Sequence, residues 1–294
     1  MHDGEVEIGV PLVQALLREQ FPQWAGLPIK PVPSAGTDNA LYRLGDDMVV
    51  RLPRIDWAVA QVEKEHEWLP KLAPFLPLAI PEPLAQGAPG RGYPWPWSVY
   101  RWLEGQNQTI DNLRNPIQAA IDLAQFIKAL QQIDTTGAPT PGSHDLSRGK
   151  PLGSRDTYTR EAIAKLDGMI DAAAATALWD TALQAPAWNR EPVLFHGDLL
   201  AGNLLFRRGR LHAVIDFGAL AAGDPACDLM IAWGLFTGES RVAFRQALGV
   251  DDATWERGRG FALSQAMIFI PYYLDTNPMG VAYAQNTLAE LLSA

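Results

Sequence analysis

One short segment of this 294-residue sequence carries acidic and amide side chains at spacings that suit chemistry on phosphate groups. His196-Gly197-Asp198 is followed by Asn203, and Asp216-Phe217-Gly218 begins thirteen residues after Asn203. Phosphoryl transfer needs a carboxylate that orients and deprotonates the attacking hydroxyl, and it needs oxygen ligands for magnesium. An Asp, an Asn and a second Asp supply both kinds of group. The segment therefore predicts transfer of the γ-phosphate of ATP or GTP to a small hydroxylated molecule.

The order and spacing of these motifs matter more than any one of them. Either tripeptide alone also occurs in ordinary turns, but together they match the spacing of protein kinases, with His-Gly-Asp in place of His-Arg-Asp. The apolar run Ala213-Val214-Ile215 predicts a strand that delivers Asp216. His196 itself is interpreted as a structural residue that hydrogen-bonds the loop backbone.

Composition narrows the class of protein. The formal net charge is −9, which argues against a nucleic-acid partner, because such binding depends on clustered Lys and Arg. The single cysteine, Cys227, allows no intramolecular disulfide and no cysteine-rich zinc site. No export signal and no apolar run of membrane-spanning length are visible. These features predict a cytoplasmic protein with no membrane partner.

The first hundred residues are predicted to form a small β-rich lobe. Gly45-Asp46-Asp47 reads as a tight connection between two strands, and Asp56 is the expected N-cap of the first helix. A Pro-rich loop should follow that helix. The predicted strands are 29–34, 40–44, 48–52 and 97–102, and the predicted helix is 56–72.

After Gly105 the apolar spacing becomes helical, as at Ile117, Ile121, Ala124 and Ile127. The sequence predicts an α+β protein with a small antiparallel β-rich N-terminal lobe and a larger, mostly helical C-terminal lobe. Residues 1–103 would bind the nucleotide and end in a hinge, and residues 104–294 would hold the catalytic and substrate groups. The C-terminal predictions are a loop at 134–154, a helical stretch at 157–183, strands at 193–196, 204–206 and 211–216, and helices from 224 onward.

Arg51 stands where a kinase strand would place its phosphate-binding lysine. Period-two alternation puts Val49 and Arg51 on one face of the strand, so Val49 is positioned to touch a nucleotide base. Glu65 is the expected partner of Arg51, because it alone among the nearby glutamates lies on the apolar stripe of the helix and needs a positive partner there. The alternative is a surface arginine at an edge of the sheet. His66 is assigned to a solvated charged face.

The segment from His196 to Leu229 resembles the aminoglycoside phosphotransferase family, whose fold is similar to that of protein kinases. The resemblance covers nearly the whole chain. It implies that Asp198 is the catalytic base, that Asn203 binds magnesium, and that Asp216 is the principal magnesium ligand. The further segments that carry it are Gly36–Asn39, Leu41–Leu44, Val49–Arg54, Trp68–Pro70 and Tyr93–Trp102. Asp224 and Asp228 match a family segment too, and they are interpreted as structural caps and hydrogen-bond acceptors.

The nucleotide contacts are predicted in two places. Backbone N–H and hydroxyl groups of the loop Ser34, Gly36, Thr37 and Asn39 would hold phosphates, although an ordinary hairpin turn would look similar. Backbone groups near Tyr100 to Trp102, at the end of the last small-lobe strand, would hydrogen-bond a purine. The alternative for Tyr100 and Trp102 is simple core packing.

The acceptor is left open by the sequence. Converging acids among Asp156, Glu161, Asp167, Glu239 and Asp275 would favour a polyamine-like aminoglycoside antibiotic, and hence antibiotic resistance. A site lined by Trp179, Trp188, Tyr272 and Tyr273 would favour a macrolide, and a metabolite such as an amino alcohol or a sugar is the further alternative. A protein kinase is disfavoured by the short stretch after Asp216-Phe217-Gly218. A weakly active nucleotide-binding module is the remaining alternative, and the oligomeric state is not predicted.

Overall fold

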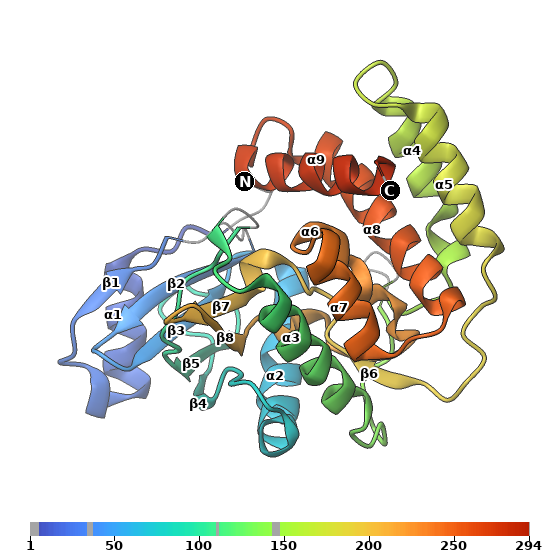
Figure 1. Cartoon of the computed structure of the whole chain (residues 1–294). Coiled ribbons are helices and arrows are strands. Elements are labelled where there is room, and N and C mark those ends of the chain that lie inside the picture. The colour runs from blue at the N-terminus through green and yellow to red at the C-terminus, as the bar shows by residue number, and fades with distance from the viewer. Residues whose placement is uncertain (1–5, 34–37, 110–111, 143–147, 294) are drawn as a thin grey trace. The chain divides into compact units, whose positions relative to one another are not determined.

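The computed structural model describes residues 6–33, 38–109, 112–142 and 148–293, and Figure 1 labels its elements. The chain folds into two compact units. The first unit takes residues 1–74, 79–104 and 214–218, and the second takes residues 75–78, 105–213 and 219–294. The single boundary predicted between residues 103 and 104 leaves residues 214–218 outside the first unit.

The first unit is built on a five-stranded antiparallel sheet in the order β1-β2-β3-β5-β4 (Figure 1). The β2–β3 hairpin turns at Gly45, whose φ of 58° suits glycine. On β3, Met48, Val50 and Leu52 are buried while Val49 and Arg51 are partly exposed, as period-two alternation predicts. The strands are β1 (Ile29–Pro31), β2 (Asn39–Leu44), β3 (Met48–Pro53), β4 (Pro83–Gly87) and β5 (Trp97–Arg101).

Two helices accompany this sheet, α1 (Val10–Gln20) and α2 (Val59–Leu72). Val13, Leu16 and Leu17 of α1 are buried in one apolar core with residues of β2, β3 and β5. Neither α1 nor β4 was predicted, and the Pro-rich segment that contains β4 was expected to be a loop. The prediction of Asp56 as an N-cap was wrong, because Asp56 begins a 3₁₀ turn and makes no capping hydrogen bond.

The second unit is mostly helical. The helix α8 is buried on several faces, and it packs against α4, α5 and α9, while α3 packs against α7. Side-chain caps fix some helix starts: Asn115 accepts from Gln118 N on α3, and Asp251 accepts from Thr254 N on α8. The helices are α3 (Pro116–Gln131), α4 (Asp156–Lys165), α5 (Ala172–Gln184), α6 (Ile231–Gly234), α7 (Gly238–Leu248), α8 (Asp252–Tyr273) and α9 (Pro278–Leu292).

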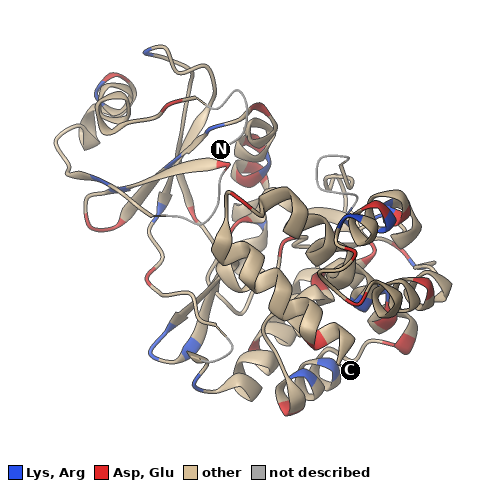
Figure 2. Cartoon of the chain, turned by 90° about the horizontal axis from the view of Figure 1, so that it is seen from above, with Lys and Arg blue, Asp and Glu red and all other residues tan. Residues whose placement is uncertain are grey.

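Short strands flank the segment from His196 to Gly218 that contains the predicted catalytic motifs. β6 (Val193–Phe195) pairs with β9 (Ala221–Gly223), and β7 (Leu204–Arg207) forms a hairpin with β8 (Arg210–Val214). The helical stretch predicted at 157–183 is instead two helices, α4 and α5, and β9 was not predicted. Figure 2 shows acidic and basic residues interspersed along the helices. No helix in the described part of the chain is long and apolar enough to cross a membrane. The predicted α+β class is confirmed.

Candidate active site

Arg51 and Glu65 form a buried ion pair in the first unit. Arg51 Nη1 on β3 donates to both carboxylate oxygens of Glu65 on α2, each at 2.7 Å. Glu65 is only 1% exposed, and a carboxylate so deeply buried requires donors of this kind. The Tyr100 hydroxyl donates to the same carboxylate. The predicted pairing of Arg51 with Glu65 is therefore confirmed.

The guanidinium of Arg51 also has acceptors beyond Glu65. Its Nη2 donates to Gln61 Oε1 at 3.0 Å and to Asp216 Oδ1 at 3.1 Å. The Asn39 amide oxygen, in the orientation that satisfies both groups, accepts from Nε at 3.2 Å and from Nη2 at 3.0 Å. Burial alone lowers the pKa of Arg51, but the carboxylates of Glu65 and Asp216 outweigh it and hold that pKa above its ordinary value. The Arg51 guanidinium is therefore held in one orientation and stays positively charged.

The residues predicted at the hinge are already engaged. The Tyr100 side chain is buried and points to Glu65, and burial raises the pKa of its hydroxyl. The backbone N–H of Trp102 donates to Asp47 O at 2.7 Å, and the backbone N–H of Arg101 donates to Glu82 O at 2.9 Å. These two N–H groups cannot also bind a purine, because strand pairing uses them on both sides of β5. Packing of Val49 or the Trp102 ring on a nucleotide base stays a prediction.

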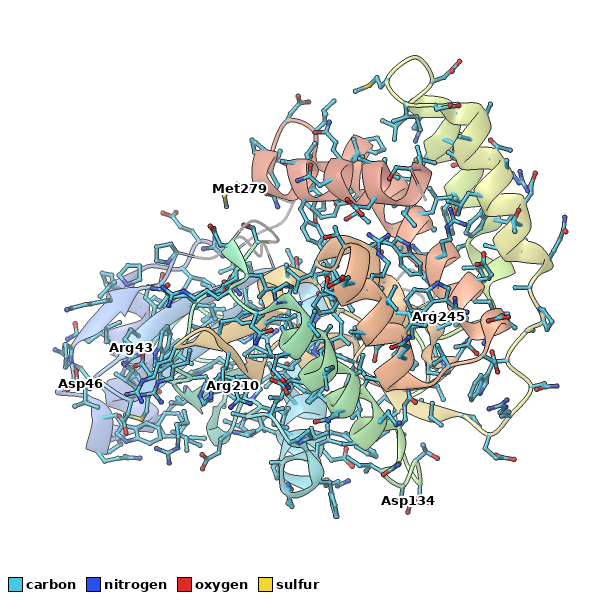
Figure 3. All side chains as sticks on the ribbon, in the orientation of Figure 1. Arg43, Asp46, Asp134, Arg210, Arg245 and Met279 are labelled. Atoms are coloured by element: carbon cyan, nitrogen blue, oxygen red, sulfur yellow. The ribbon has the colours of Figure 1, made fainter. Side chains whose placement is uncertain are left out.

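The Trp102 ring is covered on one face by the Arg43 guanidinium, 4.1 Å from the ring centroid; Figure 3 labels Arg43 on β2. His66 is half-buried rather than solvated, and its Nε2 lies 3.0 Å from Ser98 Oγ on β5. Burial lowers the pKa of His66, although Glu65 opposes this. The assignment of His66 to a charged outer face was therefore wrong.

Three residues of the predicted phosphate-binding loop, Ser34, Gly36 and Thr37, lie outside the described residues.

Asp216 lies in a turn that α2 holds in place. Its φ of 67° is in the left-handed region, which is uncommon for a residue with a side chain. Lys64 Nζ donates to Gly218 O at 2.5 Å, and a Cβ on Gly218 would lie 2.6 Å from Gln61 Cδ. Gly218 therefore lies directly against the end of the Gln61 side chain. The Asp216 side chain is 44% exposed, so its second oxygen remains available to a ligand.

In the second unit, the loop that carries Asp198 is fixed by a buried carboxylate. Asp228 is fully buried and accepts from the backbone N–H groups of His196 and Gly197, both at 2.7 Å. His196 Nδ1 accepts from the Asp198 N–H at 3.1 Å, so the structural role predicted for His196 is confirmed. Burial raises the pKa of Asp228 to about 7, against the opposing effect of those N–H groups and of Arg148.

Asp224 also has a structural role. It caps the 3₁₀ turn Pro225–Met230 through the Ala226 N–H at 3.0 Å, and it pairs with Arg257 at 2.7 Å. Both side chains of this ion pair are about equally buried, at 4% exposure. The interpretation of Asp224 and Asp228 as structural residues is confirmed.

Both oxygens of Asp198 have partners. Asn203 Nδ2 donates to Oδ2 at 2.9 Å and to the Asp198 backbone oxygen at 2.8 Å, and Arg148 Nη1 lies 2.8 Å from Oδ1. The Asp198 side chain is 21% exposed, so it still reaches solvent. Because the Asn203 amide nitrogen faces Asp198, the planar amide group directs its oxygen the other way.

Two residues of this site were missed by sequence reasoning. Arg148 comes from the Pro- and Gly-rich loop that had been given no role. Asn107 Nδ2 donates to Gly202 O at 2.7 Å and to Leu204 O at 3.0 Å, which fixes the turn around Asn203. Both act across long sequence separations from irregular segments. No periodicity or spacing in the sequence signals either contact.

Some of the groups considered for the acceptor already have partners of their own. Trp179 is fully buried and donates from Nε1 to Asp156 at 2.7 Å, and Asp156 also pairs with Arg160. Tyr272 is 61% exposed. Among the described residues no group of three or more His, Cys, Asp or Glu side chains is arranged to hold a metal. The contacts of Trp179, Asp156 and Tyr272 favour neither the polyamine nor the macrolide interpretation.

Comparison with known proteins places this geometry in a family. The sequence profile described as the phosphotransferase enzyme family matches residues 29–261. A search of curated proteins finds no sequence match. Solved structures of similar fold include the GDP and kanamycin complex of APH(2")-IIia, which is 20% identical with a TM-score of 0.75 and covers 96% of this chain and 97% of that one.

Two further solved structures have a fold similar to that of this chain. The streptomycin–ATP–APH(2")-IIa ternary complex is 20% identical with a TM-score of 0.62, and the coverage is 98% of this chain and 99% of that one. The macrolide 2'-phosphotransferase MphH from Brachybacterium faecium is 21% identical with a TM-score of 0.61, and the coverage is 96% and 98%. These likenesses confirm the two-part, kinase-like fold. Since the family profile spans most of the sequence, the chain belongs to the phosphotransferase enzyme family.

Proposed function

We propose that this protein transfers the γ-phosphate of ATP or GTP to a hydroxyl group of a small molecule. The observation that carries the proposal is the arrangement at Asp198. Its carboxylate is held by Arg148 and Asn203, still reaches solvent, and stands on a loop clamped by Asp228. The solved structures of similar fold contain GDP or ATP with kanamycin or streptomycin, and this supports nucleotide and small-molecule ligands here.

Asp198 acts as the general base in the proposed reaction. The acceptor oxygen forms a new bond to the γ-phosphorus as the bond from that phosphorus to the β,γ-bridging oxygen breaks. The hydroxyl proton passes to the Asp198 carboxylate, and a nucleoside diphosphate leaves. Asn203 and Arg148 hold the carboxylate in one orientation. Positioning of this kind contributes to the rate because the reacting atoms are already aligned.

Magnesium fits the donor atoms that these residues present. The exposed carboxylate oxygen of Asp216 and the amide oxygen of Asn203 are hard oxygen ligands of the type that Mg²⁺ prefers. When bound with the nucleotide, the ion neutralises charge on its phosphates. Arg51, fixed by Glu65 and charged at all physiological pH values, supplies positive charge beside Asp216 and is proposed to contact a phosphate. Asn39, Val49, Tyr100 and Trp102 remain predicted nucleotide residues.

The test is turnover of a confirmed acceptor by Asp198→Asn. Loss of a general base should lower kcat by about 10²–10⁴. Asp180→Asn, which removes an exposed carboxylate on α5, is the matched control and should retain activity. Activity of Asp198→Asn within a few fold of wild type contradicts the proposal. A role in antibiotic resistance and a cytoplasmic location remain predictions, to be tested by expression in a susceptible host and by fractionation.

A further inference from the structure

Three polar side chains of α2, Gln61, Lys64 and Glu65, lie on one face of the helix. Their spacing along the chain makes them neighbours on the helix surface. Glu65 is buried, whereas Gln61 and Lys64 are half-buried. All three contact either the turn 216–218 or Arg51, which is bound to that turn. This face of α2 is therefore directed toward the turn that carries Asp216.

The Asp216 end of the turn is joined to α2 through Arg51. Arg51 Nη1 donates to the Glu65 carboxylate, and Nη2 donates to Asp216 Oδ1 at 3.1 Å. The same Nη2 donates to Gln61 Oε1 at 3.0 Å. The Arg51 side chain is only 14% exposed, so these charged contacts are weakly screened by salt. One oxygen of Asp216 is thereby fixed relative to the helix.

The Gly218 end of the turn is held by α2 directly. Lys64 Nζ donates to Gly218 O at 2.5 Å. The amide group of Gln61 lies against the Gly218 Cα, where an added Cβ would be 2.6 Å from Gln61 Cδ. Between the two ends, the Phe217 side chain is fully buried. Each residue of the turn is therefore held by its surroundings.

The backbone of Asp216 depends on such support. Its φ of 67° lies in the left-handed region, and a residue with a side chain keeps that conformation where its surroundings fix it. A change in this backbone conformation would redirect the carboxylate, because both are attached to the same Cα. Groups that orient a metal ligand typically change the metal affinity roughly ten- to a hundredfold when they are removed.

We infer that Lys64 and Gln61 are positioning residues for magnesium binding, which hold the turn so that Asp216 presents its exposed oxygen in one direction. The inference rests on the proposed function, because that reaction makes Asp216 a magnesium ligand. Lys64 acts by fixing the direction of the Gly218 carbonyl group, and Gln61 acts by packing against the Gly218 Cα. In this account neither side chain touches the metal or the nucleotide.

The test measures ADP binding to the full chain by calorimetry, once with magnesium and once with EDTA. The affinity with magnesium divided by the affinity with EDTA gives the contribution of the metal. Lys64→Met should lower this ratio roughly tenfold or more, with little change in the affinity for metal-free ADP. Lys64→Arg keeps a charged donor and should retain most of the ratio. Lys71→Met removes an exposed lysine of the same helix, paired with Glu67, and is the matched control.

The sign of the change separates positioning from a simple charge effect. An ammonium group that acted only by its charge would repel the metal, so its removal would raise the ratio. A lysine that only stabilised the fold would, when replaced, lower the midpoint of thermal unfolding and leave the ratio unchanged. Either result with Lys64→Met overturns the inference.

Gln61→Ala repeats the test without any change of charge, and it keeps the inference testable even if Lys64→Met fails to fold. The ratio should fall here too, because the packing against Gly218 is lost. An unchanged ratio in a folded Gln61→Ala variant overturns the inference as well. The proposed function fails separately, through absence of nucleotide binding by wild type or through an unaffected Asp198→Asn variant.

Discussion

Replacement of Asp228 by asparagine should remove a pH-dependent contribution to stability. The carboxyl is fully buried, and burial raises its pKa to about 7 from the ordinary 3.8. The folded chain therefore holds a proton that the unfolded chain releases near pH 4. Because the folded state binds more protons between these two values, Asp228 makes wild type less stable as the pH rises toward 7, and the loss levels off above it.

The size of the effect follows from the pKa difference. Between pH 5 and pH 8 the folded carboxyl loses its proton while the unfolded one is already ionised. The folded carboxyl keeps its proton from pH 5 up to its pKa of about 7, an interval of about two pH units. Over each of these units the free energy of unfolding falls by about 1.4 kcal/mol. The free energy of unfolding of wild type should thus fall by about 3 kcal/mol relative to a variant that has no carboxyl at this position.

The assay is urea unfolding of wild type and Asp228→Asn, followed by tryptophan fluorescence, at pH 5, 6, 7 and 8. The difference in free energy of unfolding, variant minus wild type, should rise with pH by about 3 kcal/mol. Subtraction cancels the titration of all other groups. Glu239→Gln, an exposed carboxylate on α7, is the control. A difference that is constant across this pH range would refute the assignment of a raised pKa to Asp228.

Two further variants test the supports of the reacting groups. Glu65→Gln should leave the Arg51 charge without its buried carboxylate, and we expect the KM for the nucleotide to rise tenfold or more. The control is Glu63→Gln, which replaces an exposed glutamate on the same helix. An unchanged KM would argue against a nucleotide role for Arg51. Gly197→Ala should distort the catalytic loop, because φ is 82° and a Cβ would lie 2.7 Å from Ala219 O. The backbone strain, about 1–3 kcal/mol, should lower kcat or the free energy of unfolding. The control is Gly202→Ala, which should change neither, because open space surrounds the position of its Cβ.

The parts of the fold that the sequence predicted are those with a clear period. Alternation along β3 placed Arg51 opposite the buried Val50, and helical spacing on α2 singled out Glu65 as the inward carboxylate. The missed helix α1 has the same kind of signal, since Val13, Leu16 and Leu17 recur at helical spacing and are all buried. That pattern was overlooked and was not absent from the sequence.

Other features could not be predicted because they depend on contacts between distant segments. His66 lies among glutamates in sequence, and only the pairing of β5 beside β3 brings Ser98 to it. Arg148 meets Asp198 from a loop fifty residues away in the chain. Local pattern carries no information about such pairs, since tertiary packing decides them.

The arginine at position 51 illustrates why residue type and geometry must be judged together. A lysine offers a single point charge, whereas arginine offers a planar fork of five donors. In this chain the fork reaches Glu65, Gln61 and Asp216, and the amide oxygen of Asn39. One ammonium group has three donors and cannot cover this arc. The surrounding acceptors are therefore matched to arginine, and the departure from the kinase lysine is accommodated by the residues around it and does not by itself indicate a lost activity.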